Sequence, residues 1–357
     1  MIKFKRVACL ITAALILYSV PCSAAGPLEG GQILALGDSI TTGYLLDGSH
    51  SDVCYANLVG EAADCVVINR AIDGNTAQGL LMQLQVGNLN WAIRESDIVT
   101  ITCGGNDMLA FLEDTAEKML EELYQKIQEY MPAGKRADDY EDVQEPAGTT
   151  TETSEHPSET QPAEQEVPTV DLDRFYELFE DFVTGIDQSF AYIEEAKAGA
   201  PLWERMAYLA YESIVEYALS NVSAELIDFT ESDAYAAALA EYAERMLEIT
   251  SYIKDINPDI QIIIATQYNP YGEFSSRACR VIRDFVDAGV KKLNAVITEN
   301  AETGGYRTTD VYSAFVQSES NLCNASEKPL LLDVHPNLEG HEVIAKCILE
   351  GISGAQM

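Results

Sequence analysis

The sequence predicts an α/β protein built on a five-stranded parallel sheet. Towards both ends of the chain, short apolar runs with the length of buried strands alternate with segments of helical periodicity. Polar loops that contain glycine, asparagine or aspartate follow several of these runs. Strands that alternate with helices in this way form parallel sheets with right-handed crossovers, so we expect one such sheet.

The five expected strands share a place between turn signals and helical segments. They are residues 33–36, 65–69, 97–102, 260–265 and 306–311. Helices are expected at residues 55–63, after a cap at Thr76, within residues 274–299 and at residues 338–352, where apolar residues recur at helical spacing.

The alternation stops in the middle of the chain. Residues 108–256 read as a helical insert between two parts of one α/β domain, residues 26–107 and 257–357. Aromatic and aliphatic stripes in the insert indicate helix–helix packing rather than a substrate cleft. Residues 132–168 are rich in Glu, Thr, Ser and Pro and poor in apolar side chains, which predicts a disordered acidic tract.

Residues 1–25 read as a secretory signal peptide. A basic start, an apolar run over residues 7–20 and the small residues Ser23, Ala24 and Ala25 follow one another in that order. The apolar run is short for a bilayer span, which disfavours the alternative of an uncleaved anchor. We therefore expect a secreted or cell-surface protein without stable membrane insertion after cleavage.

Charge and cysteine content exclude several classes of function. The formal net charge is −36, and a chain this acidic repels nucleic acid. The six cysteines beyond the signal are scattered without the C-x-x-C spacing of zinc sites, so we expect no metal. An exported chain can form disulfides, and a bridge between Cys54 and Cys65 is expected, with Cys103 as a buried thiol.

Candidate chemistry gathers in the loops that follow strands. Gly37-Asp38-Ser39 ends the first strand and opens a helix, where unpaired backbone N–H groups favour negative charge. In a doubly wound sheet such loops meet in one crevice. Alone, Ser39 could be a simple helix cap, and Asp38 and Asp107 are expected to be structural.

Four motifs, read together, resemble the GDSL or SGNH hydrolase family. They are G-D-S, N-x-x-x-x-G, G-G-N-D and D-x-H-P-N, in that order along the chain. The resemblance implies a flavodoxin-like three-layer α/β/α sandwich that carries a serine ester hydrolase. It also implies a nucleophile at Ser39, a base at His335, an orienting acid at Asp333, and an oxyanion hole formed by Ser39, Gly74 and Asn106.

Elementary chemistry agrees with those implied roles. A serine hydroxyl is a weak nucleophile until a base accepts its proton, and an imidazole with an ordinary pKa of about 6.5 suits that task. Glycine and asparagine amides supply the donors that a tetrahedral oxyanion needs. Of the other histidines, His50 is expected at the rim of the cleft and His341 at the surface or in packing.

The acid departs from the family pattern. The usual spacing is D-x-x-H, but Leu332 occupies that position and Asp333 lies two residues before His335. Either Asp333 still reaches the imidazole, or a backbone carbonyl orients the ring of a Ser–His dyad. We favour Asp333, because triad roles are set by geometry rather than spacing.

The sequence thus predicts a secreted serine esterase that needs no cofactor. Its expected substrates are carbohydrate O-acetyl groups or small esters. Two alternatives stay open: a lysophospholipase or lipase that acts on acyl lipids, with the insert as a lid, and a non-catalytic module that binds glycan or protein.

Overall fold

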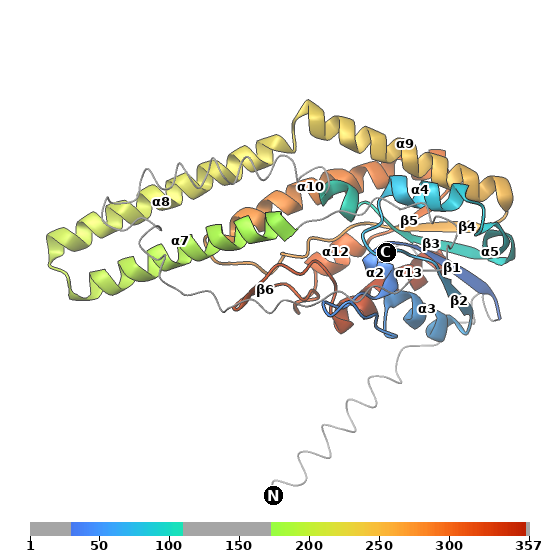
Figure 1. Ribbon diagram of the computed structural model, residues 1–357, viewed down its shortest axis with the longest axis horizontal. Coiled ribbons are helices and arrows are strands. Elements are labelled where there is room, and N and C mark those ends of the chain that lie inside the picture. The colour runs from blue at the N-terminus through green and yellow to red at the C-terminus, as the bar shows by residue number, and fades with distance from the viewer. Residues whose placement is uncertain (1–29, 110–172, 355–357) are drawn as a thin grey trace, which may run out of the picture.

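The computed structural model describes residues 30–109 and 173–354, and its centre is a five-stranded parallel sheet (Figure 1). The strands are β1 (Gln32–Gly37), β2 (Val66–Asn69), β3 (Ile98–Thr102), β4 (Gln261–Ala265) and β5 (Arg307–Thr309). Their order across the sheet is β2-β1-β3-β4-β5, and every neighbouring pair is parallel. This is the flavodoxin-like order. The predicted fold class is confirmed.

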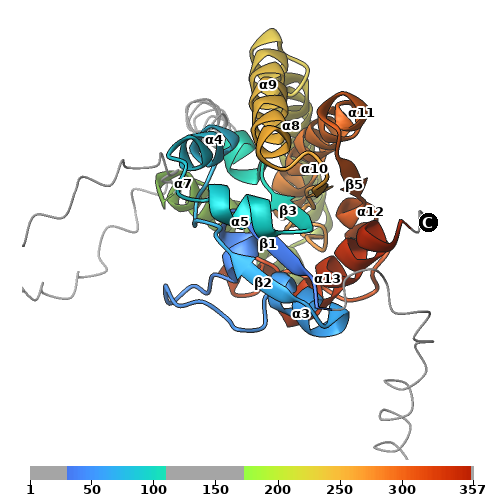
Figure 2. The same cartoon turned by 90° about the vertical axis from the view of Figure 1, so that its right-hand side faces the viewer.

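Helices cover both faces of the sheet (Figure 2). On one face lie α3 (Tyr55–Ala63), α12 (Val311–Val316) and α13 (Leu338–Ser353), and on the other lie α4 (Ala77–Gln85), α5 (Asn90–Glu95) and α9 (Asp233–Ile256). Successive residues of a strand point to opposite faces. In β1, Ile33 packs into one core and Leu34 into the other. This two-sided burial explains why residues 33–36 of β1 are all apolar.

The helices of the middle region divide into two groups. Helix α9 packs on the sheet through buried residues such as Tyr242, Met246 and Ile249. Helices α7 (Asp173–Gly199) and α8 (Leu202–Phe229) form a hairpin whose tip lies far from the sheet (Figure 1). Helix α10 (Cys279–Glu299) runs between the hairpin and the sheet and contributes to both cores.

Several predicted features lie outside the described residues. These are the signal peptide, the acidic tract over residues 132–168, and the rest of residues 110–172 of the predicted helical insert. Within the described ranges, no helix combines the length and the apolar character that crossing a membrane requires.

Short elements differ most from the sequence expectation. The last strand ends at Thr309 rather than at residue 311, because Asp310 caps α12 by accepting a hydrogen bond from the Ser313 N–H. Helices α5, α11 (Ala301–Gly304) and α12 were not predicted, since four to six residues are too few to show helical periodicity. The antiparallel pair β6 (Ser326–Glu327) and β7 (Leu330–Leu331) was also not predicted.

The predicted bridge between Cys54 and Cys65 is wrong, because both thiols are free. Cys54 caps the start of α3 and Cys65 follows its end. Nine helical residues rise by about 13 Å, whereas a disulfide needs Cα atoms within about 7 Å. Cys103 is buried, as predicted, and burial raises its pKa well above the ordinary range.

Candidate active site

Ser39 lies at the turn between β1 and the short helix α2 (Ser39–Thr42). Asp38 caps this helix, and its carboxylate accepts a hydrogen bond of 3.1 Å from the Ile40 N–H. Gly37 has a φ of +134°, and a Cβ built there would lie 2.0 Å from the Thr102 carbonyl oxygen. Only glycine permits so close an approach of β1 to β3, and this approach places Ser39 at the carboxyl end of the sheet.

A buried polar network lies beneath Ser39. The Thr102 hydroxyl donates to Asp38 over 3.2 Å, and Thr41 bonds both Thr102 and the hydroxyl of Tyr55. Burial raises the pKa of Asp38 to about 7, although hydrogen bonds from Ile40 and Thr102 oppose that rise. The network joins β1, β3, α2 and α3. Its hydrogen bonds therefore fix the position of the turn that carries Ser39.

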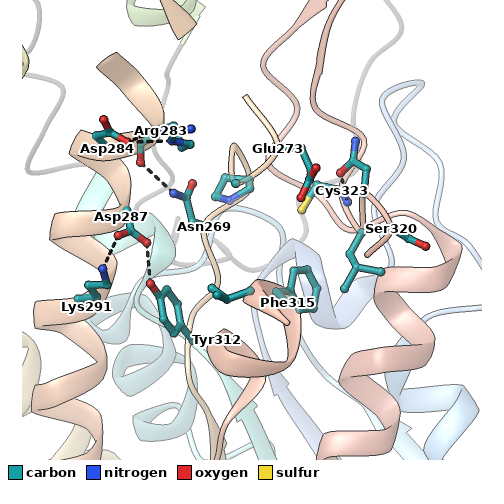
Figure 3. Close-up of a pocket in the computed structure, with 15 residues that line it drawn as sticks. Asn269, Glu273, Arg283, Asp284, Asp287, Lys291, Tyr312, Phe315, Ser320 and Cys323 are labelled. Carbon is teal, nitrogen blue, oxygen red and sulfur yellow. Dashed lines mark hydrogen bonds and ion pairs between the residues drawn. The ribbon is translucent and has the colours of Figure 1, made fainter. Parts of the chain in front are cut away.

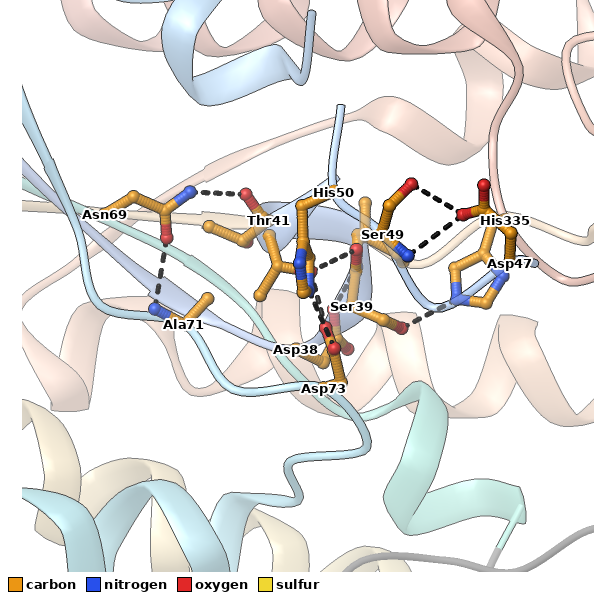
Figure 4. Close-up of polar contacts among 12 residues, drawn as sticks. Asp38, Ser39, Thr41, Asp47, Ser49, His50, Asn69, Ala71, Asp73 and His335 are labelled. Atoms are coloured by element: carbon orange, nitrogen blue, oxygen red, sulfur yellow. Dashed lines mark hydrogen bonds and ion pairs between the residues drawn. The ribbon is translucent and has the colours of Figure 1, made fainter. Parts of the chain in front are cut away.

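Ser39, His335 and Asp333 form one hydrogen-bonded row. His335 Nε2 lies 2.9 Å from Ser39 Oγ (Figure 4), and His335 Nδ1 lies 2.6 Å from Asp333 Oδ1. Of the two arrangements considered from the sequence, the structure has the one in which the carboxylate contacts the ring. Asp333 also accepts the backbone N–H of His335 over 3.0 Å, so the short D-x-H spacing brings the carboxylate to both groups.

The surroundings of Asp333 favour its ionised form. Its side chain is buried, which alone would raise the pKa of the carboxyl group. Hydrogen bonds from the ring and backbone of His335, together with the charge of His335, outweigh burial and lower the pKa of Asp333 below its ordinary value. An ionised carboxylate is the form that can orient an imidazole.

Two tyrosines that the sequence analysis did not single out hold the loop of His335. The Tyr268 hydroxyl donates to the Val334 carbonyl over 2.9 Å, and the Tyr271 hydroxyl donates to the Leu332 carbonyl over 3.0 Å. Both tyrosines belong to the loop after β4, and both are buried. A signal was present in the sequence, because a tyrosine placed among buried residues needs a partner for its hydroxyl.

Gly74 and Asn106 lie in loops next to the Ser39 turn. The Ile72 N–H donates to the Gly37 carbonyl over 3.1 Å, which ties the Gly74 loop to the end of β1. Asn106 Nδ2 donates to the Asn75 carbonyl over 3.0 Å, and its second amide hydrogen is not used by that bond. Within residues 30–109 and 173–354, the backbone N–H groups of Ser39 and Gly74 have no acceptor.

A comparison with known families gives one match, over the first half of the chain. The model of the GDSL-like lipase/acylhydrolase family matches residues 35–186. Residues 35–186 of the chain therefore resemble this family. The matched range includes Ser39, Gly74 and Asn106 and ends before Asp333 and His335. The family recognition made from the four motifs is confirmed, and with it the coarse activity of a carboxylic ester hydrolase.

Solved structures of hydrolases are similar to this chain at low identity. A phospholipase A1 from Streptomyces albidoflavus NA297 is 15% identical, with 90% of this chain and 99% of the other covered and a TM-score of 0.45. An acetylxylan esterase from Geobacillus stearothermophilus is 16% identical, with 91% and 95% covered and a TM-score of 0.41. These values support no conclusion about substrate. No curated protein sequence matches the chain.

Polar and aromatic side chains form the rim of the candidate site. The ring of Tyr44 lies 5.0 Å from the ring of His335, centroid to centroid. His50 Nε2 lies 2.8 Å from Asp73 Oδ2, and Asp73 also accepts a hydrogen bond from Thr42 (Figure 4). His50 and Asp73 are both partly exposed, so they present polar groups to solvent beside Ser39.

Two further titratable residues have structural contacts. Asp107 accepts the Ala77 N–H at the start of α4 with both carboxylate oxygens, each at 3.0 Å, and burial raises its pKa to about 6. His341 is buried, and its Nδ1 accepts the Tyr55 N–H over 3.3 Å. Burial lowers the pKa of His341 to about 4, so this histidine is neutral at neutral pH and serves packing.

The described part of the chain also contains a cavity of about 330 Å³ beside the loop after β4 (Figure 3). Its wall includes Asn269, Tyr312 and Phe315, and none of the five predicted site residues lines it. Among residues 30–109 and 173–354, no group of three or more His, Cys, Asp and Glu side chains is placed to hold a metal ion.

Proposed function

We propose that this GDSL-family hydrolase is a serine esterase that works through an acyl-Ser39 intermediate. One observation carries the proposal: Ser39 Oγ, both ring nitrogens of His335 and Asp333 Oδ1 form a row with separations of 2.9 and 2.6 Å. This is the arrangement in which a base can take the serine proton while a carboxylate fixes the tautomer of the base.

The proposed reaction has two halves. Ser39 Oγ attacks the ester carbonyl carbon while its proton passes to His335 Nε2. The C–O bond to the alcohol then breaks, and the alcohol leaves with that proton. In the second half a water molecule gives a proton to His335 Nε2 and attacks the acyl carbon. The bond between that carbon and Ser39 Oγ then breaks, and Ser39 Oγ takes the proton back from His335 as the acid leaves. Asp333 stays ionised throughout and stabilises the imidazolium.

Three donors are proposed to stabilise the oxyanion of each tetrahedral intermediate. They are the backbone N–H groups of Ser39 and Gly74 and the free amide hydrogen of Asn106. Each has the capacity to donate, since none of these hydrogens is bonded to another described residue. Donors fixed before the reaction lower the barrier because they need no reorganisation.

The polar side chains at the rim favour small or acetylated polar molecules as substrates. The partly exposed pair His50–Asp73 can hydrogen-bond the hydroxyl groups of a sugar beside the ester that Ser39 attacks. We therefore propose carbohydrate O-acetyl groups or small esters as substrates. A second candidate is an acyl lipid, because Leu45 and Leu46 follow Tyr44 and are 42% and 60% exposed at the same rim.

Hydrolysis of p-nitrophenyl acetate tests the nucleophile. We expect Ser39→Ala to lower kcat by about 10⁴-fold or more. Ser49→Ala is the matched control, since Ser49 is a rim serine whose hydroxyl bonds only the carboxylate of Asp47 and should be dispensable. A fluorophosphonate probe should label the parent protein at Ser39. If neither hydrolysis nor labelling occurs, the chain is a non-catalytic binding module.

The length of the acyl chain and the identity of the alcohol group in the ester distinguish the two substrate classes. An acetyl esterase should prefer p-nitrophenyl acetate to the octanoate and should release acetate from acetylated sugars. Preference for octanoate, with release of fatty acid from lysophospholipid, would instead favour the lipid substrate. His50→Ala should lower the rate of hydrolysis of sugar esters more than that of p-nitrophenyl acetate, because only the sugar has hydroxyl groups that can hydrogen-bond the rim.

We also propose that the chain is exported with removal of residues 1–25. The basic start and the apolar run before the small residues at 23–25 support this proposal. Expression of the full chain, followed by N-terminal sequencing of the protein outside the cytoplasm, tests it. A product that stays in the cytoplasm with Met1 intact would contradict export.

A further inference from the structure

Helix α8 has a second apolar face that no described residue covers. Val215, Leu219 and Leu226 on its inner side are buried. On the outer side seven uncharged residues form what we call the α8 stripe. They are Leu202, Met206, Leu209, Ser213, Tyr217, Ser220 and Ala224, and all seven are exposed.

The stripe is continuous along the helix. Its members follow one another at intervals of four, three, four, four, three and four residues, which keeps them on one side of a helix with 3.6 residues per turn. Leu202, Met206 and Tyr217 are 75%, 60% and 70% exposed. An outer helix face of a protein with a net charge of −36 should carry charge, and this one carries none over about 33 Å.

Two copies of the stripe fit one another when they run in opposite directions. Large residues occupy the first half and small residues the end of the second half. If two copies of α8 lie antiparallel with Ser213 facing Ser213, then Leu202 faces Ala224, Met206 faces Ser220, and Leu209 faces Tyr217. In the first two pairings a large side chain lies opposite a small one, which lets the two helices interdigitate. Leu209 and Tyr217 form a large apolar contact nearer the axis, and the two-fold axis makes every pairing occur twice.

We propose that the α8 stripe is the interface of a two-fold symmetric homodimer with the axis at Ser213. The available area is sufficient. An aromatic side chain carries about 150–250 Å², so Tyr217 and the adjoining Trp203, each 70% exposed, offer about 200–350 Å² per copy. Leu202, Met206 and Leu209 add a comparable amount. Two copies together approach the lower limit for specific interfaces, about 1,200 Å².

The polar groups at the centre of the stripe are already satisfied. Ser213 Oγ donates to the Leu209 carbonyl and Ser220 Oγ donates to the Glu216 carbonyl, each over 2.9 Å within the same helix. Glu216, which flanks the stripe, pairs with Arg277 of its own copy over 2.5 Å. Contact near the axis therefore leaves neither serine hydroxyl without a partner and does not oppose two unpaired carboxylates.

Cysteine cross-linking tests the register. In the proposed dimer Ser213→Cys faces its own copy and should form an intermolecular disulfide on mild oxidation. Ser220→Cys is the matched control on the same exposed stripe, and its two copies are about 21 Å apart. The parent protein gives the background from the native cysteines. Cross-linking of Ser213→Cys alone supports the proposal, and any other result overturns it.

Sedimentation tests the association itself and does not depend on catalysis. The parent protein should be a dimer, more strongly so at high salt because salt screens repulsion between acidic copies. Met206→Glu should be a monomer that keeps its melting temperature. Val86→Glu is the control, because Val86 is equally exposed, at 60%, and lies outside the stripe. A monomeric parent, or a dimeric Met206→Glu, would contradict the proposal and leave a lipid surface or another protein as the occupant.

Discussion

One carboxylate oxygen of Asp333 holds both the backbone and the ring of His335. Oδ1 lies 3.0 Å from the His335 backbone nitrogen and 2.6 Å from Nδ1. The backbone bond closes a tight turn over two residues, and this turn brings the ring back over the same oxygen. A D-x-H spacing therefore suffices to leave Nε2 pointing at Ser39.

Asp333→Asn should remove the orienting charge while it keeps the shape of the side chain. We expect kcat for p-nitrophenyl acetate to fall by about 10³–10⁴, because an amide favours the wrong tautomer of the imidazole. KM should change little. Asp73→Asn is the control, since this rim carboxylate contacts His50 rather than His335. A loss of less than about tenfold in Asp333→Asn would mean that His335 works without the carboxylate.

Asn106→Ala should separate oxyanion stabilisation from substrate binding. Loss of one oxyanion donor typically lowers kcat by about 10²–10³, with little change in KM. Asn57→Ala removes a comparable amide that donates to the Asp52 carbonyl at the surface, and it should keep full activity. A rise in KM with unchanged kcat would show that Asn106 binds the ground state instead.

The sheet could be predicted because its signals are local. Each long strand is mainly apolar and is followed by a glycine or a polar loop, as Ile33 to Gly37 illustrates. The short helices carried no such signal. The false bridge between Cys54 and Cys65 had a related cause, because closeness in sequence was taken for closeness in space although a helix separates the two residues.

In the candidate site, only the residues that belong to sequence motifs could be predicted. Ser39 opens a helix after β1, and Gly74, Asn106 and His335 lie in segments that connect strands and helices, where the fold brings loops together. The contact of Asp333 required coordinates, since spacing allowed two arrangements. Tyr268 and Tyr271 were missed because their role depends on carbonyl groups more than sixty residues away in the chain.

The buried Asp38 should make stability depend on pH. Its pKa is about 7 in the folded protein against about 3.9 in an unfolded chain. The folded state therefore keeps a proton that the unfolded state has lost between pH 4 and 7, so the free energy of unfolding falls as pH rises through this range.

Asp38→Asn tests this dependence, because the amide can cap α2 but cannot titrate. Between pH 5 and 8 the parent protein should lose about 2–3 kcal/mol more stability than the variant, measured by urea unfolding. Asp47→Asn should retain the parental slope, since Asp47 is exposed and its pKa is lowered by hydrogen bonds from Ser49. Equal slopes in the parent and Asp38→Asn would show that Asp38 is ionised throughout.

Gly37→Ala should destabilise the fold at the point where β1 approaches β3. The new Cβ would lie 2.0 Å from the Thr102 carbonyl oxygen, and the φ of +134° disfavours any side chain. We expect a loss of about 3 kcal/mol or more in urea unfolding. Gly48→Ala is the matched control, because Gly48 also has a positive φ, +80°, but nothing lies within 4 Å of its Cβ position. It should lose only about 1 kcal/mol. Similar losses in the two variants would mean that backbone conformation, rather than the contact with Thr102, limits position 37.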